Sequence, residues 1–201
     1  DLSEFETVNF ELTRSLCELI RANGQKIPLI LASSTQANLD NPYGKSKRAS
    51  EMAVEGLANE IGNPVYIYRL PGVFGKWCRP NYNSVVATFC NNIAKGIPVQ
   101  IKDISTKLSL VYVDDVVADF VSVLQQDSAG IVRPLIEPEY NITLGELASQ
   151  IRAFGNCRVN LISEQVGTGL VRALYSTYVS YLKPEQFSYL LPCHLDERGV
   201  F

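Results

Sequence analysis

The sequence has few of the residues that metal centres and disulfide frameworks need. It contains one histidine, His194, and five cysteines among 201 residues. The cysteines are Cys17, Cys78, Cys90, Cys157 and Cys193, with no Cys-x-x-Cys pair. An odd, scattered set argues against a disulfide framework or a zinc site and favours reduced thiols in a cytoplasmic protein. We therefore predict no metal site and interpret His194 as a surface residue.

Long apolar runs and an excess of positive charge are also missing. The longest apolar runs fall far short of the roughly 18 residues that a membrane-spanning helix needs. The net charge of -3 gives no basic field for nucleic acid. The apolar fraction of 46 % and the charged fraction of 19 % are ordinary, so neither disorder nor low complexity is indicated. We expect a folded protein that binds neither nucleic acid nor a membrane.

A glycine-rich phosphate-binding turn is a third absence. Gly167-Thr168-Gly169 is the only G-x-G in the chain, and Arg172 stands where a third glycine is needed. Such a turn lets the backbone approach a pyrophosphate between a strand and a helix, and this late segment does not fit. The chain also opens on Asp1, without an initiating Met and already within a helical pattern. We therefore expect a fragment whose cofactor-binding turn lies upstream of Asp1.

Short apolar runs alternate with helical patterns along the chain. Apolar residues at spacings of three and four predict a helix over residues 3–22, with Ser3 as its N-cap and Asn23-Gly24 as its end. Further strands are predicted at 27–32, 65–70, 108–113 and 159–162, and further helices at 43–61, 84–95, 114–125, 143–154 and 170–182. This order predicts an α/β fold with a partial Rossmann-like, doubly wound parallel sheet. Ligands of such sheets bind beyond the carboxyl ends of the strands.

The strand predicted at 27–32 and the helix that follows it carry a possible proton-transfer group. Tyr43 and Lys47 are four residues apart and share one helix face, and Ser34 lies at the end of the strand. A tyrosine has a pKa of about 10, and a neighbouring lysine cation lowers such a value. The tyrosine can then exchange a proton with a carbonyl oxygen that a serine hydroxyl holds. These three residues are what carbonyl reduction with a nicotinamide cofactor requires, and the lysine can also bind the cofactor ribose.

Spacing alone is weak evidence for this group, because a half-buried tyrosine beside a solvated lysine gives the same Tyr-x-x-x-Lys pattern. The surrounding sequence favours function. The tyrosine follows Asn41-Pro42 at a helix start, and Ser33-Ser34-Thr35 ends the preceding strand. The adjacent acids Asp114 and Asp115 are less suited to catalysis, because Asp114 follows a strand and is better explained as an N-cap.

The loop at 71–82 is rich in Gly, Pro, Asn and aromatic residues. Lys76 and Arg79 could bind a diphosphate, and Trp77 or Tyr82 could stack on a uracil or sugar ring. Alternatively, the charges are solvated and the aromatic rings pack on the core. Asn83 is either a plain N-cap or a contact to a nucleotide sugar. Later tyrosines at 175, 178 and 181 are better explained by packing than by cofactor binding.

Three motifs occur in the order Ser33-Ser34-Thr35, Asn41-Pro42-Tyr43-Gly44-Lys45-Ser46-Lys47 and Leu110-Val111-Tyr112-Val113-Asp114-Asp115-Val116. In these motifs the chain resembles the extended short-chain dehydrogenase/reductases, the Rossmann-fold epimerases, dehydratases and reductases of nucleotide sugars. Arg69-Leu70-Pro71-Gly72-Val73-Phe74-Gly75 falls where that family runs from a central strand into the loop for cofactor and substrate. Gly72 departs from the asparagine common there, which puts one contact in doubt. The resemblance covers roughly residues 27 to 125.

A narrower resemblance rests on Ser33-Ser34-Thr35-Gln36-Ala37, Gly75-Lys76-Trp77-Cys78-Arg79-Pro80-Asn81-Tyr82-Asn83-Ser84 and Leu174-Tyr175-Ser176-Thr177-Tyr178. These segments are similar to the capsular-polysaccharide reductases of the UDP-N-acetyl-L-fucosamine pathway. That family reduces C4 of a UDP-2-acetamido-2,6-dideoxy-hexos-4-ulose with NADPH, and a C-terminal cupin domain epimerises the sugar at C3. The last residues, from Asp196 to Phe201, resemble the opening of such a cupin.

The resemblance implies roles for individual residues. Catalysis falls to Ser34, Tyr43 and Lys47. Cofactor binding falls to Tyr43, Lys47, Pro71 and Val73, and substrate binding to Ser34, Lys76, Arg79 and Asn83. The expected cofactor is NADP(H), with NAD as the alternative, and the expected substrate is a UDP-linked deoxy amino sugar.

The resemblance also predicts how the chain is organised. Residues 1–70 would be the C-terminal part of a dinucleotide-binding domain, 71–190 a mostly substrate-binding region, and 191–201 a linker into a missing cupin. We expect a homodimer in the full-length enzyme. Two alternatives remain: an NAD-dependent nucleotide-sugar 4-epimerase or dehydratase on the same scaffold, and a non-catalytic fragment or binding module.

Overall fold

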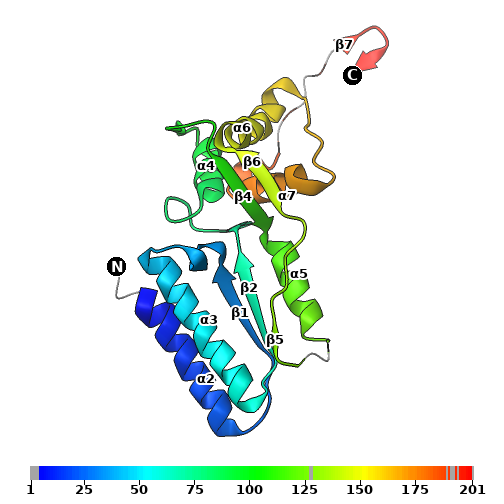
Figure 1. Cartoon of the computed structure of the whole chain (residues 1–201). Helices are drawn as coiled ribbons and strands as arrows, with labels where there is room; N and C mark the ends of the chain where they lie inside the picture. Colours follow the sequence, from blue (N-terminus) through cyan, green and yellow to red (C-terminus); the bar gives the residue numbers. More distant parts are fainter. Residues whose placement is uncertain (1–4, 127–128, 189, 191–192, 194, 201) are drawn as a thin grey trace. The chain divides into compact units, whose positions relative to one another are not determined.

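The computed structural model describes residues 5–126, 129–188, 190, 193 and 195–200. The chain divides into two units (Figure 1). The first consists of Asp1–Val73 and Leu108–Asn141, and the second of Phe74–Lys107 and Ile142–Phe201. The predicted N-cap Ser3 and the predicted surface residue His194 lie outside the described residues.

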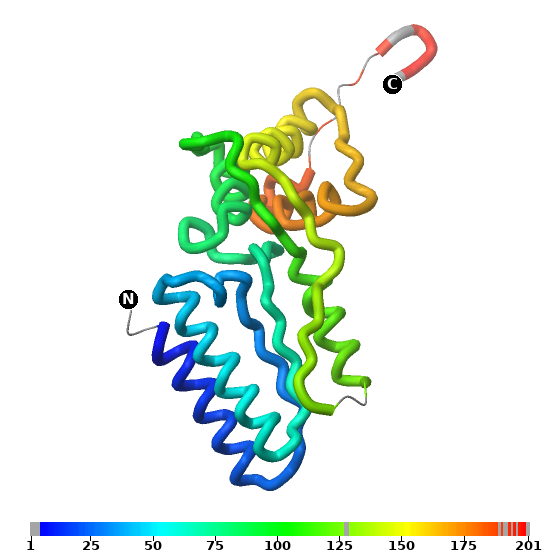
Figure 2. The backbone as a smooth tube through the Cα atoms, viewed as in Figure 1, coloured from blue at the N-terminus to red at the C-terminus, as the bar shows by residue number. Residues whose placement is uncertain are grey.

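The first unit is built on a parallel sheet with strand order β1-β2-β5. The strands are β1 (Leu29–Ser34), β2 (Val65–Leu70) and β5 (Ile131–Val132). Its helices are η1 (Glu6–Glu11), α2 (Leu12–Asn23), η2 (Thr35–Asn38), α3 (Pro42–Ile61) and α5 (Val113–Val123). In Figure 2, α2 and α3 both run opposite to the strands that follow them, as βαβ crossovers require.

Helices cover both faces of this sheet. Successive side chains of a strand point to opposite faces, so Val65 and Ile67 pack with α2 and α3, whereas Tyr66 and Tyr68 pack with Val116 of α5 and its neighbours. This confirms the predicted α/β fold with a parallel sheet. It also explains why β2 is apolar almost throughout, since neither of its faces meets water.

Local sequence sets the start and the end of α3. Asn41 is its N-cap and accepts a hydrogen bond from Gly44 N–H at 2.7 Å, and Pro42 fills the first helical position. Gly44 permits the close approach of η2, because a Cβ there would lie 2.2 Å from the carbonyl oxygen of Gln36. Gly62 ends the helix in the left-handed region at φ 67°.

The second unit packs three helices: α4 (Val85–Ala94), α6 (Leu144–Asn160) and α7 (Gly169–Val179). Its core includes the buried side chains Phe89, Leu147, Ile151, Phe154 and Leu174. The predicted capping box is confirmed: Thr143 Oγ1 accepts from Glu146 N–H at 3.2 Å, and Glu146 Oε2 accepts from Thr143 N–H at 2.8 Å. The rings of Tyr175 and Tyr178 lie 5.3 Å and 6.0 Å from that of Phe154, so the packing interpretation of these tyrosines is confirmed.

Three short strands, β3 (Gly72–Phe74), β4 (Lys107–Tyr112) and β6 (Tyr140–Thr143), form a second sheet in the order β3-β4-β6. Near the end of the chain, β7 (Leu195–Asp196) and β8 (Gly199–Val200) form an antiparallel hairpin. The 3₁₀ turn η3 (Pro184–Gln186) lies between α7 and this hairpin. Within the described residues, no helix has the length and apolar character needed to cross a membrane.

Two expectations from the sequence are wrong. The strand predicted at 159–162 does not form, because α6 continues to Asn160 and Leu161 caps it at φ 57°. Val159 is 87 % exposed and Ile162 is 64 % exposed, so this apolar run is not a buried strand. Asp114 is not an N-cap, because Tyr112 occupies that position. Asp114 and Asp115 both lie in the first turn of α5, where their negative charges interact favourably with the positive end of the helix dipole.

Of the two interpretations of Asn83, the N-cap is excluded, because Ser84 is the N-cap of α4. Ser84 Oγ accepts from Ala87 N–H at 3.3 Å, and Asn83 is exposed outside the helix.

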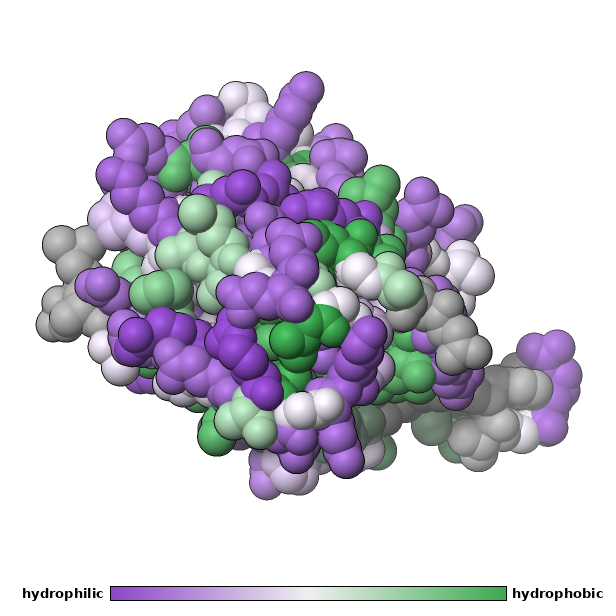
Figure 3. Space-filling view, turned by 60° about the horizontal axis from the view of Figure 1, so that its bottom comes forward, coloured by the Kyte–Doolittle hydropathy of each residue, from purple (hydrophilic) through white to green (hydrophobic). Residues whose placement is uncertain are grey.

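The first predicted helix forms, although its first part is the π-helical η1. On the face shown in Figure 3, apolar residues lie between hydrophilic ones.

Candidate active site

Ser34 closes β1 and is 8 % exposed. Its backbone is extended, and its Oγ caps η2 by accepting a hydrogen bond from Gln36 N–H at 3.2 Å. In the parallel register Ser34 lies opposite Leu70, the last residue of β2. Because the Oγ is the acceptor in this contact, the hydroxyl can still donate its proton to a ligand oxygen. Ser34 therefore combines a fixed backbone with a hydroxyl at the carboxyl end of the sheet.

Tyr43 and Lys47 lie on the first two turns of α3. The Nζ of Lys47 is 5.8 Å from the centre of the Tyr43 ring and donates a hydrogen bond to the carbonyl oxygen of Ala32 at 3.1 Å. This bond ties the helix to β1 two residues before Ser34. Burial lowers the pKa of Lys47. The ring of Phe5 packs against that of Tyr43 edge to face, with centroids 5.6 Å apart.

Pro71 follows β2 directly, so it lies next to Leu70, the register partner of Ser34. Val73 is 38 % exposed in β3. A Cβ on Gly72 would lie 3.1 Å from the carbonyl oxygen of Ser109, which is a steric reason for glycine at this position. A cavity of about 640 Å³ opens at the carboxyl ends of β2 and β5, and it is lined by Tyr68, Arg69, Leu70, Pro71 and residues 134–139. Ligands of parallel α/β sheets bind at this end.

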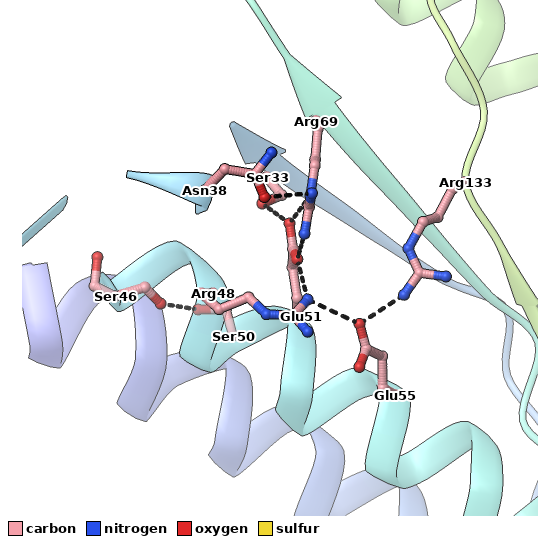
Figure 4. Close-up of polar contacts among 9 residues, drawn as sticks. All are labelled: Ser33, Asn38, Ser46, Arg48, Ser50, Glu51, Glu55, Arg69 and Arg133. Carbon is pink, nitrogen blue, oxygen red and sulfur yellow. Dashed lines mark hydrogen bonds and ion pairs between the residues drawn. The ribbon is translucent and has the colours of Figure 1, made fainter. Parts of the chain in front are cut away.

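A buried carboxylate, Glu51, was not predicted from the sequence. It lies on α3 one turn beyond Lys47 and is fully buried. Arg69 binds both of its oxygens, with Nε at 2.9 Å from Oε1 and Nη2 at 2.7 Å from Oε2. Ser33 Oγ donates to Oε1 at 2.5 Å, and Arg48 Nη1 donates to Oε2 at 2.7 Å. Figure 4 shows these contacts converging on one side chain.

The electrostatics of Glu51 follow from these contacts. Burial raises its pKa, but hydrogen bonds from Arg69, Ser33 and Arg48 together outweigh burial and lower the pKa to about 2. The hydrogen bonds that Arg69 donates to Glu51 correspondingly raise the pKa of Arg69. The carboxylate is therefore ionised at neutral pH. Two sequence signals could have indicated it: a glutamate two turns after Tyr43 on the same helix, and an arginine within the apolar strand β2.

The Tyr43 helix is also tied to the preceding helices. Asn9 in η1 donates from Nδ2 to Ser46 Oγ at 3.1 Å, and Ser50 Oγ donates to the carbonyl oxygen of Asn9 at 3.0 Å. Ser46 and Ser50 are both buried. These bonds connect η1 to the face of α3 that carries Ser46 and Ser50. The sequence indicated none of them, because they join residues about 40 positions apart.

The second unit carries the three remaining predicted residues, Lys76, Arg79 and Asn83. Lys76 Nζ lies 5.8 Å from the centre of the Trp77 ring, and the Arg79 guanidinium lies 5.2 Å from the centre of the Tyr82 ring. Trp77 and Tyr82 are 79 % and 67 % exposed, so the alternative that these rings pack on the core is wrong.

Backbone contacts hold this loop in place. Trp77 N–H donates to Ser180 Oγ at 3.2 Å, and the hydroxyl of Tyr181 donates to the carbonyl oxygen of Cys78. Asn81 N–H donates to Thr88 Oγ1 at 2.9 Å. The loop therefore has a defined course, with the side chains of Trp77, Arg79 and Tyr82 exposed.

In the first unit, the structure thus brings Ser34, Tyr43, Lys47 and Pro71 to the carboxyl ends of β1 and β2. This group offers a hydroxyl donor, a phenol and an ammonium, which is a set suited to exchanging a proton with a carbonyl oxygen.

The chain belongs to the NAD dependent epimerase/dehydratase family, whose model matches residues 1–142. A relative from Pseudomonas aeruginosa, UDP-2-acetamido-2,6-beta-L-arabino-hexul-4-ose reductase, is 54 % identical over 198 residues, which are 98 % of this chain and 53 % of that protein. The capsular polysaccharide assembling protein CapF from Staphylococcus aureus has a solved structure with a TM-score of 0.86 and 39 % identity, and the match covers 94 % of this chain and 51 % of CapF. The chain thus spans about half the length of these relatives.

The UDP-glucose 4-epimerase of Thermotoga maritima is more distant. Its structure gives a TM-score of 0.73 at 20 % identity, and the match covers 90 % of this chain and 71 % of the epimerase. At this identity the likeness concerns the fold alone. It agrees with the parallel sheet of the first unit.

Proposed function

We propose that this chain is the proton-handling part of an enzyme that reduces the 4-keto group of a UDP-2-acetamido-2,6-dideoxy-hexos-4-ulose. The single observation that carries the proposal is the bond from Lys47 to Ala32, which holds the Tyr43 helix against the strand that ends at Ser34. The activity of the Pseudomonas aeruginosa relative supports the choice of substrate. Capsule or O-antigen synthesis in the cytoplasm is the setting we propose.

The residues present fit the nicotinamide ribose of NADP(H). Lys47 is partly buried, and one of its three N–H groups donates a hydrogen bond to the carbonyl oxygen of Ala32. This bond orients the ammonium group, and the other N–H groups can donate to a ribose hydroxyl. Pro71 and Val73 follow the strand end next to Ser34 and would contact the nicotinamide side. When bound, the cofactor supplies the hydride. We propose NADP(H), and NAD is the alternative.

Each of the three residues also has a task at the reacting carbonyl in this proposal. Ser34 donates a hydrogen bond to the keto oxygen and stabilises the charge that develops there. Tyr43 gives its proton to that oxygen as the carbon is reduced. Lys47 stabilises the negative charge left on Tyr43 with its ammonium group.

Substrate recognition is proposed for the loop of the second unit. Lys76 and Arg79 would bind the diphosphate, and Asn83, which is not the helix cap, would contact the nucleotide sugar. The exposed rings of Trp77 and Tyr82 are suited to stacking on uracil or the sugar. The division into cofactor, substrate and linker regions at residues 70 and 190 stays a prediction.

We further propose a homodimer formed through α2 and α3. Leu12, Leu16 and Leu19 of α2 are 65 %, 42 % and 68 % exposed, and Met52 of α3 is 60 % exposed. The leucines of α2 are spaced three and four residues apart, so they form an exposed apolar stripe, and such a surface favours association. A groove of about 440 Å³ between α2 and α3 is lined by both apolar and charged residues, among them Met52, Arg14 and Glu60. Sedimentation velocity should give a dimer for the full-length protein and a monomer for Leu12→Glu/Leu19→Glu, with Ile104→Glu in the second unit as the control.

A cofactor balance tests the proposed reaction. The full-length protein is incubated with the UDP-4-keto sugar and NADPH, and both NADPH oxidation and the sugar product are followed. We expect one NADPH consumed for each 4-hydroxy sugar formed, and strongly reduced consumption in Ser34→Ala. Sugar conversion with no net change in cofactor would instead indicate a 4-epimerase or dehydratase. No conversion and no cofactor turnover would indicate a non-catalytic module.

A further inference from the structure

The Glu51 cluster joins four elements around the candidate active site (Figure 4). Glu51 lies on α3, Ser33 on β1 and Arg69 on β2, and Arg69 Nη1 also donates to Asn38 Oδ1 of η2 at 2.8 Å. Ser33 and Arg69 are direct partners in the parallel register. One carboxylate therefore fixes the ends of two strands, the turn between Ser34 and Tyr43, and the helix that carries Tyr43 and Lys47.

The cluster also separates the roles of two neighbouring serines. Ser33 and Ser34 are adjacent in an extended strand, so their side chains point to opposite faces. Ser33 is held toward α3 by its bond to Glu51, and Ser34 is therefore directed to the other side, where it caps η2. A rotation of the strand end would move both side chains together.

The neighbouring carboxylate, Glu55, provides an internal comparison. It lies one turn further along α3 and binds Arg48 at 3.3 Å and Arg133 at 2.7 Å. Its side chain is 20 % exposed, and its two partners are 43 % and 48 % exposed. Its hydrogen bonds reach neither Ser33 nor Arg69. Glu55 therefore has the same charge as Glu51 and lies on the same helix, but its hydrogen bonds do not link α3 to the strand ends.

We propose that Glu51 is a positioning residue, which holds the end of β1 through Ser33 and Arg69 so that Ser34 meets the keto oxygen in line with Tyr43 and Lys47. This inference rests on the proposed function. A general stabilising role does not account for the arrangement well, because replacing a buried ion pair with apolar residues often leaves stability unchanged. Four hydrogen bonds to the Glu51 carboxylate fix the strand ends at the point where the position of Ser34 matters for the proposed chemistry.

Glu51→Gln in the full-length enzyme is the main test. The amide is close in shape but replaces one acceptor oxygen with a donor, which faces an arginine N–H and disturbs the bonds that hold Ser33. We expect kcat to fall about 10- to 100-fold, since small misplacements of reacting groups have effects of this size. KM for the keto sugar and for NADPH should stay within about 3-fold of wild type, because the substrate-binding loop is not changed.

The deuterium isotope effect on hydride transfer from labelled NADPH provides a readout that instability alone does not move. A misplaced Ser34 slows the chemical step, so the isotope effect on kcat should rise in Glu51→Gln. Ser33→Ala removes only the link from β1 to Glu51 and should show the same trend, which keeps the test decisive if Glu51→Gln folds poorly. Glu55→Gln is the matched control, and its kcat and isotope effect should equal those of wild type.

The outcomes separate this inference from the proposed function. If Ser34→Ala keeps wild-type kcat and isotope effect, the proposed role of Ser34 fails. If Ser34→Ala is impaired while Glu51→Gln and Ser33→Ala keep the wild-type isotope effect, the positioning role of Glu51 is overturned. That result includes the case in which kcat falls only because fewer molecules are folded.

Discussion

The two groups of candidate site residues are held in opposite ways. In the first unit, Glu51 is fully buried and accepts four hydrogen bonds, which fix the strand ends beside Ser34. In the second unit, Arg79 and the rings of Trp77 and Tyr82 are exposed, and hydrogen bonds to Ser180 and Thr88 anchor the backbone of their loop. The first arrangement suits chemistry that needs fixed geometry, and the second suits a surface that binds a charged ligand.

This contrast explains which effects mutations should have. Removing a partner from the buried cluster leaves an uncompensated charge, so stability and geometry both change. Removing an exposed cation leaves the fold intact and affects ligand binding alone.

Acid unfolding tests the buried cluster. The folded-state pKa of Glu51, about 2, lies below the ordinary value of 4.5. The resulting stabilisation, on the order of 3 kcal/mol, is fully present above about pH 5 and is lost as the pH falls toward 2. Urea unfolding of the chain between pH 2 and 7 should show this loss. Glu51→Gln should be less stable at pH 7, and its stability should depend less on pH over this window.

Glu55→Gln is the control for the acid experiment, because its salt bridges are partly exposed and contribute little. Its unfolding curve should keep the wild-type dependence on pH. An equal flattening in both variants would contradict the contrast between buried and exposed charges.

The exposed loop is tested by removing its cations. Lys76→Ala and Arg79→Ala in the full-length enzyme should each raise KM for the UDP sugar about tenfold, which corresponds to about 1.4 kcal/mol. Because neither residue belongs to the proton-handling group, kcat should change less than about 2-fold. Steady-state kinetics with NADPH at saturation would measure both. A drop in kcat with unchanged KM would place these residues in the chemical step instead.

The smallest effect is expected at Val159, where the sequence predicted a buried strand. The side chain is 87 % exposed in α6, so Val159→Glu should change the free energy of unfolding by less than about 0.5 kcal/mol. Ile151 in the same helix is fully buried, and Ile151→Ala should cost about 2–5 kcal/mol. Urea unfolding of both variants is the measurement, and equal losses would restore the strand interpretation.

The sequence predicted the features that local chemistry determines. Gly62 ends α3, and Thr143 with Glu146 opens α6, because caps depend on a few adjacent residues. The Ser34, Tyr43 and Lys47 group was also proposed from the sequence, because Ser34 ends a strand and Tyr43 and Lys47 share one face of the next helix. Its catalytic role stays a prediction. The family assignment then followed from motifs whose order along the chain was visible.

The sequence did not predict features that depend on distant residues. Glu51 and Arg69 are 18 positions apart, and only the packing of α3 on the sheet makes them partners. The run from Val159 to Ile162 looked like a strand because a short apolar run does not distinguish a buried strand from an exposed helix end. The start of α5 was misplaced by its adjacent acids, which favour a first helical turn as much as an N-cap.

The central claim is that Tyr43 gives the proton during carbonyl reduction, and single-turnover kinetics test it most directly. The full-length enzyme, loaded with NADPH, is mixed with the UDP-4-keto sugar, and cofactor oxidation is followed for Tyr43→Phe. Tyr175→Phe removes a tyrosine hydroxyl from α7 in the second unit, where the ring packs on Phe154, and is the control. We predict a loss of about 10²- to 10⁴-fold for Tyr43→Phe and wild-type kinetics for Tyr175→Phe. A near wild-type rate in Tyr43→Phe would contradict the account.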